Sequence, residues 1–129
     1  RAAVLLGFRT AGLISMVEDF QAAGADVRLA TDDGTAGHHG LVTDLLRARC
    51  DAGAVDAIFA CGPKPMLRAT AAIAEEREIP CQLSLEQRMA CGVGACLGCA
   101  QKIRRPDGTE TYAHVCSDGP VFEASVVVW

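Results

Sequence analysis

The segment VDAIFACGPKPMLRATAAIAEEREIPCQLSLE, residues 55–86, determines the fold class of this 129-residue chain. It opens with an apolar run, residues 55–60, that is typical of a buried strand. A Gly-Pro turn then leads into a stretch with helical periodicity, residues 64–78, and a second strand-like run follows at residues 80–86. Strand, helix and strand at this spacing predict a parallel βαβ unit with a right-handed crossover.

The residues upstream repeat this pattern. Apolar runs at residues 2–8 and 26–31 predict two more buried strands. A helix is expected from Thr10, as its cap, to Ala23, and another over residues 41–49. We therefore expect an α/β domain with a parallel sheet over residues 1–87.

The pattern changes near residue 87, where we place a domain boundary. Residues 88–101 are rich in Cys and Gly, and a Pro-Asp-Gly turn then separates two short strands, residues 100–104 and 109–113. This arrangement predicts a β-hairpin. A last strand is expected over residues 121–129, so residues 88–129 form a second, small, β-rich domain.

The cysteines of this second part have a specific spacing. The loop CGVGACLGC, residues 91–99, and a distant fourth cysteine give the pattern C-x4-C-x2-C-x16-C. Four thiolates at plant-type ferredoxin spacing are typical of a [2Fe–2S] cluster. The intervening glycines permit a tight loop whose N–H groups point inward. The predicted ligands are Cys91, Cys96, Cys99 and Cys116.

Other metal sites fit this spacing less well. Zinc sites usually combine a C-x2-C pair with a second such pair or with His, and only Cys96 and Cys99 form one here. A Rieske centre replaces two cysteines by histidines. A zinc-binding or ferredoxin-like binding module remains the alternative of a different class, and a visible spectrum would distinguish zinc from an iron–sulfur cluster.

Two loops have residues suited to a nucleotide. Cys61, Gly62 and Pro63 join a predicted strand to a predicted helix, where a glycine lets a ligand approach the backbone. Asp32, Asp33 and Gly34 follow an earlier strand and could bind ribose hydroxyls. The alternatives are a tight turn with a buried cysteine and an Asx turn. These loops and the turn at Gly7 are expected at one edge of the sheet, and no side chain is assigned a catalytic role.

Composition excludes several classes of protein. The net charge of −4 argues against nucleic acid or an anionic membrane as a partner, and no apolar run is long enough to span a membrane. Seven cysteines, an odd number, fit an intracellular metal protein better than a secreted disulfide scaffold. We therefore expect a cytoplasmic protein.

The chemistry of the two predicted sites implies a further cofactor. A nicotinamide delivers two electrons at once and the cluster accepts one, so a flavin must join them. The sequence contains neither a recognisable flavin-binding barrel nor a G-x-G-x-x-G motif. We therefore expect the working protein to have more sequence before residue 1.

Four segments together resemble the electron-transfer subunits of dihydroorotate dehydrogenase B, within the ferredoxin-reductase-like superfamily. The segments are TDDGTAGHHGLVTDLL (31–46), ACGPKPML (60–67), SLEQRMACGVGACLGCAQK (84–102) and HVCSDGPVF (114–122). The resemblance covers the second half of such subunits. It implies a partial NAD-binding domain over residues 1–87 and a [2Fe–2S] domain over residues 88–129, behind an FAD-binding barrel. It also implies a catalytic subunit with FMN, from which electrons pass through the cluster to FAD and NAD in pyrimidine biosynthesis.

The resemblance carries residue roles as well. It implies that Cys91, Cys96, Cys99 and Cys116 bind the cluster. It also implies that Cys61 and Gly62 lie beside the nicotinamide of NAD and that residues 32–34 lie at the ribose end of the nucleotide. The barrel and the first strand of the NAD domain are missing, so we expect an N-terminally truncated fragment. Such a fragment is expected to be inactive alone and to self-associate through a bared sheet edge. The alternative family is the small subunit of an NADH-dependent ferredoxin:NADP or sulfide-type oxidoreductase.

Overall fold

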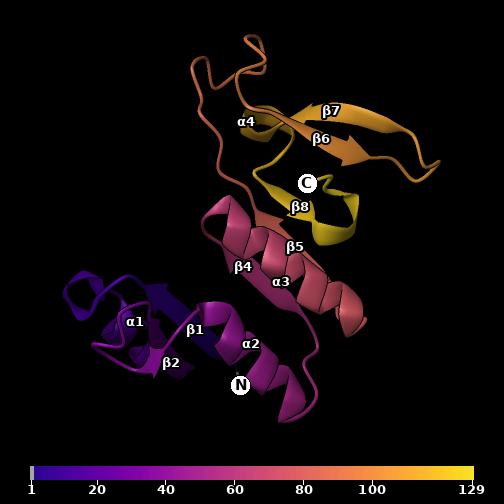
Figure 1. The fold of residues 1–129 in the computed structure, drawn as a ribbon. Coiled ribbons are helices and arrows are strands. Elements are labelled where there is room, and N and C mark those ends of the chain that lie inside the picture. The colour runs from indigo at the N-terminus through magenta and orange to yellow at the C-terminus, as the bar shows by residue number, and fades with distance from the viewer. Residues whose placement is uncertain (1) are drawn as a thin grey trace. The chain divides into compact units, whose positions relative to one another are not determined.

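A computed structural model describes residues 2–129, which form two compact units (Figure 1). One unit ends at Ala54 and the other runs from Val55 to Trp129. The domain boundary predicted near residue 87 lies inside the second unit and stays a prediction. Among residues 2–129, no helix is long and apolar enough to cross a membrane.

The first unit is a parallel sheet with the strand order β1-β2-β3. Its strands are β1 (Ala3–Phe8), β2 (Asp26–Thr31) and β3 (His38–His39). Its helices are the 3₁₀ helix η1 (Ala11–Leu13), α1 (Val17–Ala22) and α2 (Val42–Asp51). A Cβ atom on Gly7 would lie 2.8 Å from the Cβ of Val42, so this glycine allows α2 to pack closely on β1. β1 is an edge strand of this sheet. Self-association of the chain through this edge stays a prediction.

The helix predicted from Thr10 to Ala23 is wrong in extent. The structure has a single 3₁₀ turn and then the short α1, because the chain adopts a left-handed conformation at Met16 (φ 63°). Thr10 makes no capping hydrogen bond. Its hydroxyl lies 3.3 Å from that of Thr35. A contact with a distant loop thus replaces the local cap.

The second unit contains a mixed sheet and a hairpin. The sheet has the order β4-β5-β8, with β4 (Ile58–Cys61) and β5 (Cys81–Ser84) parallel and β8 (Val121–Glu123) antiparallel to β5. The hairpin pairs β6 (Ala100–Arg104) with β7 (Glu110–His114). The helices are α3 (Lys64–Glu76), α4 (Val115–Asp118) and the 3₁₀ helix η2 (Ala124–Val126). The predicted α/β class with parallel strands and a small β-rich part is confirmed.

The most deeply buried core residues of the second unit come from α3, β5 and α4. Leu67 and Ile73 on α3, Leu83 on β5 and Val115 on α4 each expose at most 1% of their surface. The strand predicted over residues 121–129 is wrong in extent. The chain leaves β8 after three residues, turns through η2, and returns to pair Val127 with Ile103 in a single bridge.

Candidate functional site

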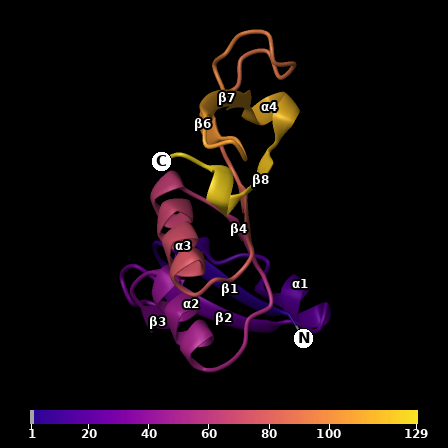
Figure 2. The same ribbon diagram turned by 90° about the vertical axis from the view of Figure 1, so that its right-hand side faces the viewer.

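The cysteine loop, residues 88–98, connects β5 to β6 and has no regular secondary structure. Figures 1 and 2 both show this connection projecting beyond the β6–β7 hairpin. Cys91 is half-buried and Cys96 is exposed, whereas Cys99 sits at the base of the loop with 2% of its surface exposed. The fourth predicted ligand, Cys116, lies on α4.

Cys91 and Cys96 form the first thiol pair. The backbone N–H groups of Val93 and Ala95 donate to the Cys91 sulfur at 3.5 and 3.3 Å, and the N–H of Gly98 donates to the Cys96 sulfur at 3.4 Å. The N–H of Val93, followed by the N–H and the thiol of Cys96, lowers the pKa of Cys91 from 9.0 to about 6. The loop therefore stabilises a thiolate at Cys91.

Cys99 and Cys116 form the second pair. The Cys116 thiol hydrogen-bonds to that of Cys99, and this contact holds the pKa of Cys116 above its usual value. A backbone hydrogen bond brings the two cysteines together: the N–H of Val115, the residue before Cys116, donates to the carbonyl oxygen of Cys99 at 3.1 Å. The negative charge of a Cys91 thiolate contributes a smaller part of the same rise in the pKa of Cys116.

The segment that carries Cys116 is held by polar contacts of its own. The N–H of His114 donates to the Asp118 carboxylate at 2.6 Å, and the N–H of Gly94 donates to the Cys116 sulfur. Gly94 has φ +78°, and a Cβ atom there would lie 3.0 Å from the Ser117 hydroxyl. Glycine at this position lets the loop approach α4 closely.

This donor set fits a [2Fe–2S] cluster. Such a cluster takes four cysteine thiolates, two on each of its irons, and the chain presents two thiol pairs with N–H groups directed at three of the sulfurs. Within residues 2–129, no three Cys, His, Asp or Glu side chains surround a common point as ligands of one metal ion. The structure therefore brings the four predicted ligands together as two contacting pairs and not as one group of three or more.

The predicted nucleotide loops are found in separate units and follow strands of two different sheets, so the prediction that they share one sheet edge is wrong. Cys61 ends β4 and is exposed, and Pro63 precedes the first residue of α3. Gly62 has φ +154°, and a Cβ atom there would lie 2.7 Å from the Met66 methyl carbon. The predicted strand, glycine turn and helix are therefore present. A role in binding nicotinamide stays a prediction.

Residues 32–34 form a turn after β2 in the first unit. The Asp33 carboxylate accepts hydrogen bonds from the Thr35 N–H at 3.0 Å and its hydroxyl at 2.6 Å. The hydroxyl of Thr35 is the main cause of a lowered pKa at Asp33. Asp33 thus makes an Asx turn. The Asp32 N–H donates to the carbonyl oxygen of Phe8 and the Gly34 N–H to that of Thr31, so Asp32 presents its side chain from a fixed backbone.

Two features of the site escaped the sequence-based prediction. Asp118 secures the backbone before Cys116, and Gln87 and Gln101 lie hydrogen-bonded on either side of the cysteine loop. Asp118 could have been predicted as a capping residue, because it lies four residues after His114 at the start of a short helix. The two glutamines belong to no sequence motif that would have predicted their hydrogen bond. Among the other cysteines, burial followed by the charge of Glu123 raises the pKa of Cys81 to about 11, which makes it a poor ligand.

Comparison with known proteins identifies the second part of the chain. Residues 86–128 match the family model of the iron-sulfur cluster binding domain of dihydroorotate dehydrogenase B. The electron transfer subunit of dihydroorotate dehydrogenase B (NAD(+)) from Caldanaerobacter subterraneus subsp. tengcongensis is 44% identical over 126 residues, which are 98% of this chain and 49% of the relative. The subunit from Bacillus caldolyticus is 48% identical, over 96% of this chain and 46% of the relative.

A solved structure has a similar fold. It is described as an NADH-dependent reduced ferredoxin-NADP oxidoreductase studied for flavin-based electron bifurcation, and it is 30% identical with a TM-score of 0.80. The match covers 98% of this chain and 44% of that one. The chain spans about half the length of the curated relatives it matches. The chain as a whole thus matches the C-terminal half of dihydroorotate dehydrogenase B electron transfer subunits, and its residues 86–128 match the iron–sulfur cluster binding domain of that family.

Proposed function

We propose that this chain is the cluster-carrying part of an electron transfer subunit of dihydroorotate dehydrogenase B, acting in pyrimidine biosynthesis in the cytoplasm. A [2Fe–2S] cluster would be held by Cys91, Cys96, Cys99 and Cys116. The observation that carries the proposal is the arrangement of these thiols as two contacting pairs, Cys91 with Cys96 and Cys99 with Cys116, with backbone N–H groups directed at three of the four sulfurs. When bound, the cluster supplies one-electron transfer between two flavins, the FMN of a catalytic subunit and FAD.

The residues of the chain have defined tasks in this scheme. Cys91 and Cys96 would bind one iron and Cys99 and Cys116 the other, because these are the thiols that contact each other. The N–H donors of Val93, Ala95 and Gly98 would stabilise negative charge on the sulfurs. The high exposure of Val93 (74%) and Leu97 (67%) fits a loop that contacts another protein.

The two predicted nucleotide loops would bind NAD, the final electron acceptor in this scheme. The exposed Cys61 and the positive φ of Gly62 suit the close approach of a nicotinamide ring to the backbone before α3. Asp32, with Gly34 beside it, would contact a ribose, while Asp33 maintains the turn through Thr35. We propose no general acid, base or nucleophile in the chain. It is therefore expected to need an added flavin protein for NADH oxidation.

The test is electron entry from the proposed partner. The reconstituted chain, mixed anaerobically with an FMN-containing dihydroorotate dehydrogenase catalytic subunit, should lose its visible absorption when dihydroorotate is added. The Cys116→Ser variant should not respond, and the Cys50→Ser control should behave like the unaltered chain. A loaded cluster that stays oxidised with an active partner and excess dihydroorotate would refute the proposal.

A second candidate is a subunit of an NADH-dependent ferredoxin:NADP oxidoreductase, which the fold similarity at 30% identity favours. The identities of 44–48% to the dihydroorotate dehydrogenase B subunits support the first candidate more strongly. The same mixture distinguishes them. Reduction of the cluster by reduced ferredoxin but not by dihydroorotate would select the second candidate.

A further inference from the structure

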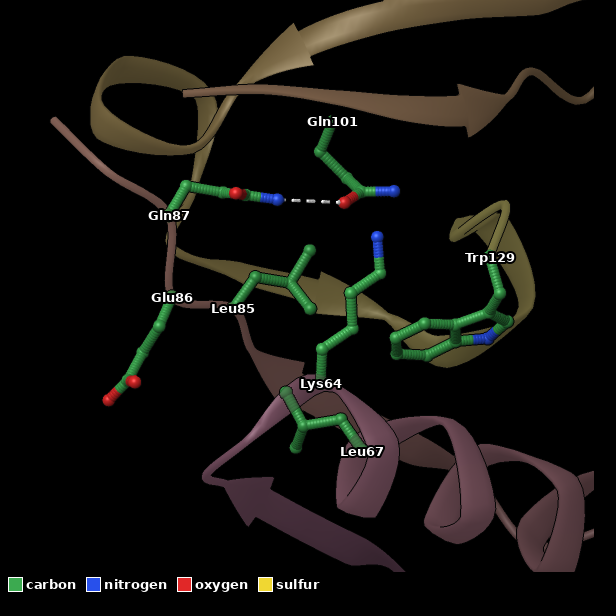
Figure 3. Close-up of a pocket in the computed structure, with 7 residues that line it drawn as sticks. All are labelled: Lys64, Leu67, Leu85, Glu86, Gln87, Gln101 and Trp129. Atoms are coloured by element: carbon green, nitrogen blue, oxygen red, sulfur yellow. Dashed lines mark hydrogen bonds between the residues drawn. The ribbon is translucent and has the colours of Figure 1, made fainter. Parts of the chain in front are cut away.

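Two glutamines lie at the neck of the cysteine loop. Gln87 is the residue immediately before the loop, and Gln101 is the second residue of β6 after it. The side-chain amide of Gln87 donates through Nε2 to Oε1 of Gln101 at 3.3 Å (Figure 3). Three of the four predicted cluster ligands lie between these residues in the sequence. The hydrogen bond therefore joins the two ends of the segment that carries most of the proposed site.

Gln101 is fixed from its other side by the backbone. Its Nε2 donates to the carbonyl oxygen of Val128 at 2.9 Å and to that of Lys102 at 3.1 Å, and the residue is only 4% exposed. Both amide hydrogens are used and the amide oxygen accepts from Gln87. The opposite orientation would direct Oε1 at two carbonyl oxygens, so the three partners define one orientation of this side chain.

The neck also adjoins the beginning of α3. A cavity of about 10 Å³, close to the size of one water molecule, lies beside Gln101. Figure 3 shows the Lys64 side chain, from the first turn of α3, extending toward Gln101 with the Trp129 ring next to it. Gln101 thus lies where the cysteine loop, the C-terminal residues and α3 come together.

We propose that Gln101 is a positioning residue that closes the neck of the cysteine loop and so keeps the thiol pairs assembled. It touches no thiol itself. It acts through the backbone that leads to Cys99 on one side and, through Gln87, to Cys91 on the other. The inference rests on the proposed function for its purpose, since the loop is the one proposed to hold the cluster. Its geometric part, closure of the neck, is independent of any cluster.

Three variants separate this role from a general effect on folding. Gln101→Leu removes all three hydrogen bonds, whereas Gln87→Leu removes only the bond across the neck. Gln82→Leu is the matched control, because Gln82 in the same unit donates to the Glu123 carboxylate at 2.7 Å, between β5 and β8. A neutral hydrogen bond of ordinary strength corresponds to a roughly 2- to 12-fold change in a local opening equilibrium.

The first measurement is hydrogen–deuterium exchange of the reduced, cluster-free chain, read on peptides that cover residues 88–100. Exchange is expected to rise about 10-fold or more in Gln101→Leu and about 2- to 12-fold in Gln87→Leu, and to stay within about 2-fold in the control. The second measurement is the rate at which a chelator removes iron from the reconstituted chain. Iron loss is expected to be fastest in Gln101→Leu, intermediate in Gln87→Leu and slowest in the Gln82→Leu control. The EPR spectrum of the reduced cluster is expected to be broadened in Gln101→Leu.

The outcomes are separable. Wild-type exchange in the loop peptides of Gln87→Leu and Gln101→Leu would overturn the proposal, as would an equal rise in Gln82→Leu. If Gln101→Leu does not fold, Gln87→Leu alone decides the matter, because the two hydrogen bonds from Gln101 to the carbonyl oxygens of Val128 and Lys102 stay intact in that variant. If the unaltered chain takes up no cluster, the proposed function fails, and the exchange measurement still decides whether Gln101 closes the neck.

Discussion

The pairing of the thiols predicts how removal of one cysteine changes the acidity of another. Cys91 has a pKa of about 6 in part because the Cys96 thiol donates to it. At pH 7 this gives about ten thiolates per thiol, where a pKa of 9.0 gives about one thiolate per hundred thiols. Cys96→Ala removes one donor and is expected to move the pKa of Cys91 upward. Cys99→Ala should leave it near 6, because Cys99 contacts Cys116 instead.

The assay is alkylation by iodoacetamide of the reduced, cluster-free chain as a function of pH, with each cysteine resolved by peptide mass spectrometry. In the unaltered chain the reactivity of Cys91 should be half-maximal near pH 6, since alkylation requires the thiolate. Cys81, with a pKa of about 11, serves as the unreactive internal reference at neutral pH. A midpoint for Cys91 near 9, or an equal upward shift in the Cys96→Ala and Cys99→Ala variants, would refute the proposed pairs.

Three further outcomes are expected. Gly62→Val places a side chain against Met66 at a φ of +154°, so NADH-dependent reduction by the assembled complex should fall while dihydroorotate-to-dye transfer persists; equal loss of both would indicate misfolding. Leu83→Ala should lower the free energy of unfolding in urea by about 2–5 kcal/mol, because Leu83 is fully buried, and a loss below about 1 kcal/mol would contradict the assigned core. The chain alone, without added flavin, should reduce dyes with NADH very slowly, and rapid turnover would reveal a flavin site that the account lacks.

Local sequence signals predicted those elements whose partners are close in the chain. The apolar runs of β1 and β2 and the Pro-Asp-Gly turn of the β6–β7 hairpin were identified because each element is determined by its own residues. The helix from Thr10 was predicted wrongly because the Thr10 hydroxyl pairs with Thr35, a residue that local periodicity does not bring near. β8 ends early because pairing with β5 holds only Val121–Glu123 in strand conformation.

The candidate site shows the same division. The cysteine spacing predicted the ligand residues, since the loop geometry of a cluster requires thiols at set intervals. It did not predict that Cys91 contacts Cys96 while Cys99 contacts Cys116, because the second contact depends on the backbone bond between Val115 and Cys99. The hydrogen bond between Gln87 and Gln101 was also invisible in the sequence, since glutamine at these positions has no motif of its own.

The most direct test of the central claim is the iron and acid-labile sulfide content of the chain after anaerobic reconstitution, measured for the unaltered protein and for single Cys→Ser variants. The account predicts about two irons and about two sulfides per chain, with the rhombic EPR signal of a reduced [2Fe–2S] cluster. Content and signal should be lost or strongly altered on substitution of any of four residues, namely Cys91, Cys96, Cys99 and Cys116. They should be retained when Cys50, Cys61 or Cys81 is replaced. Unchanged iron content and spectra in all four ligand variants, or stoichiometric zinc in place of iron, would contradict the account.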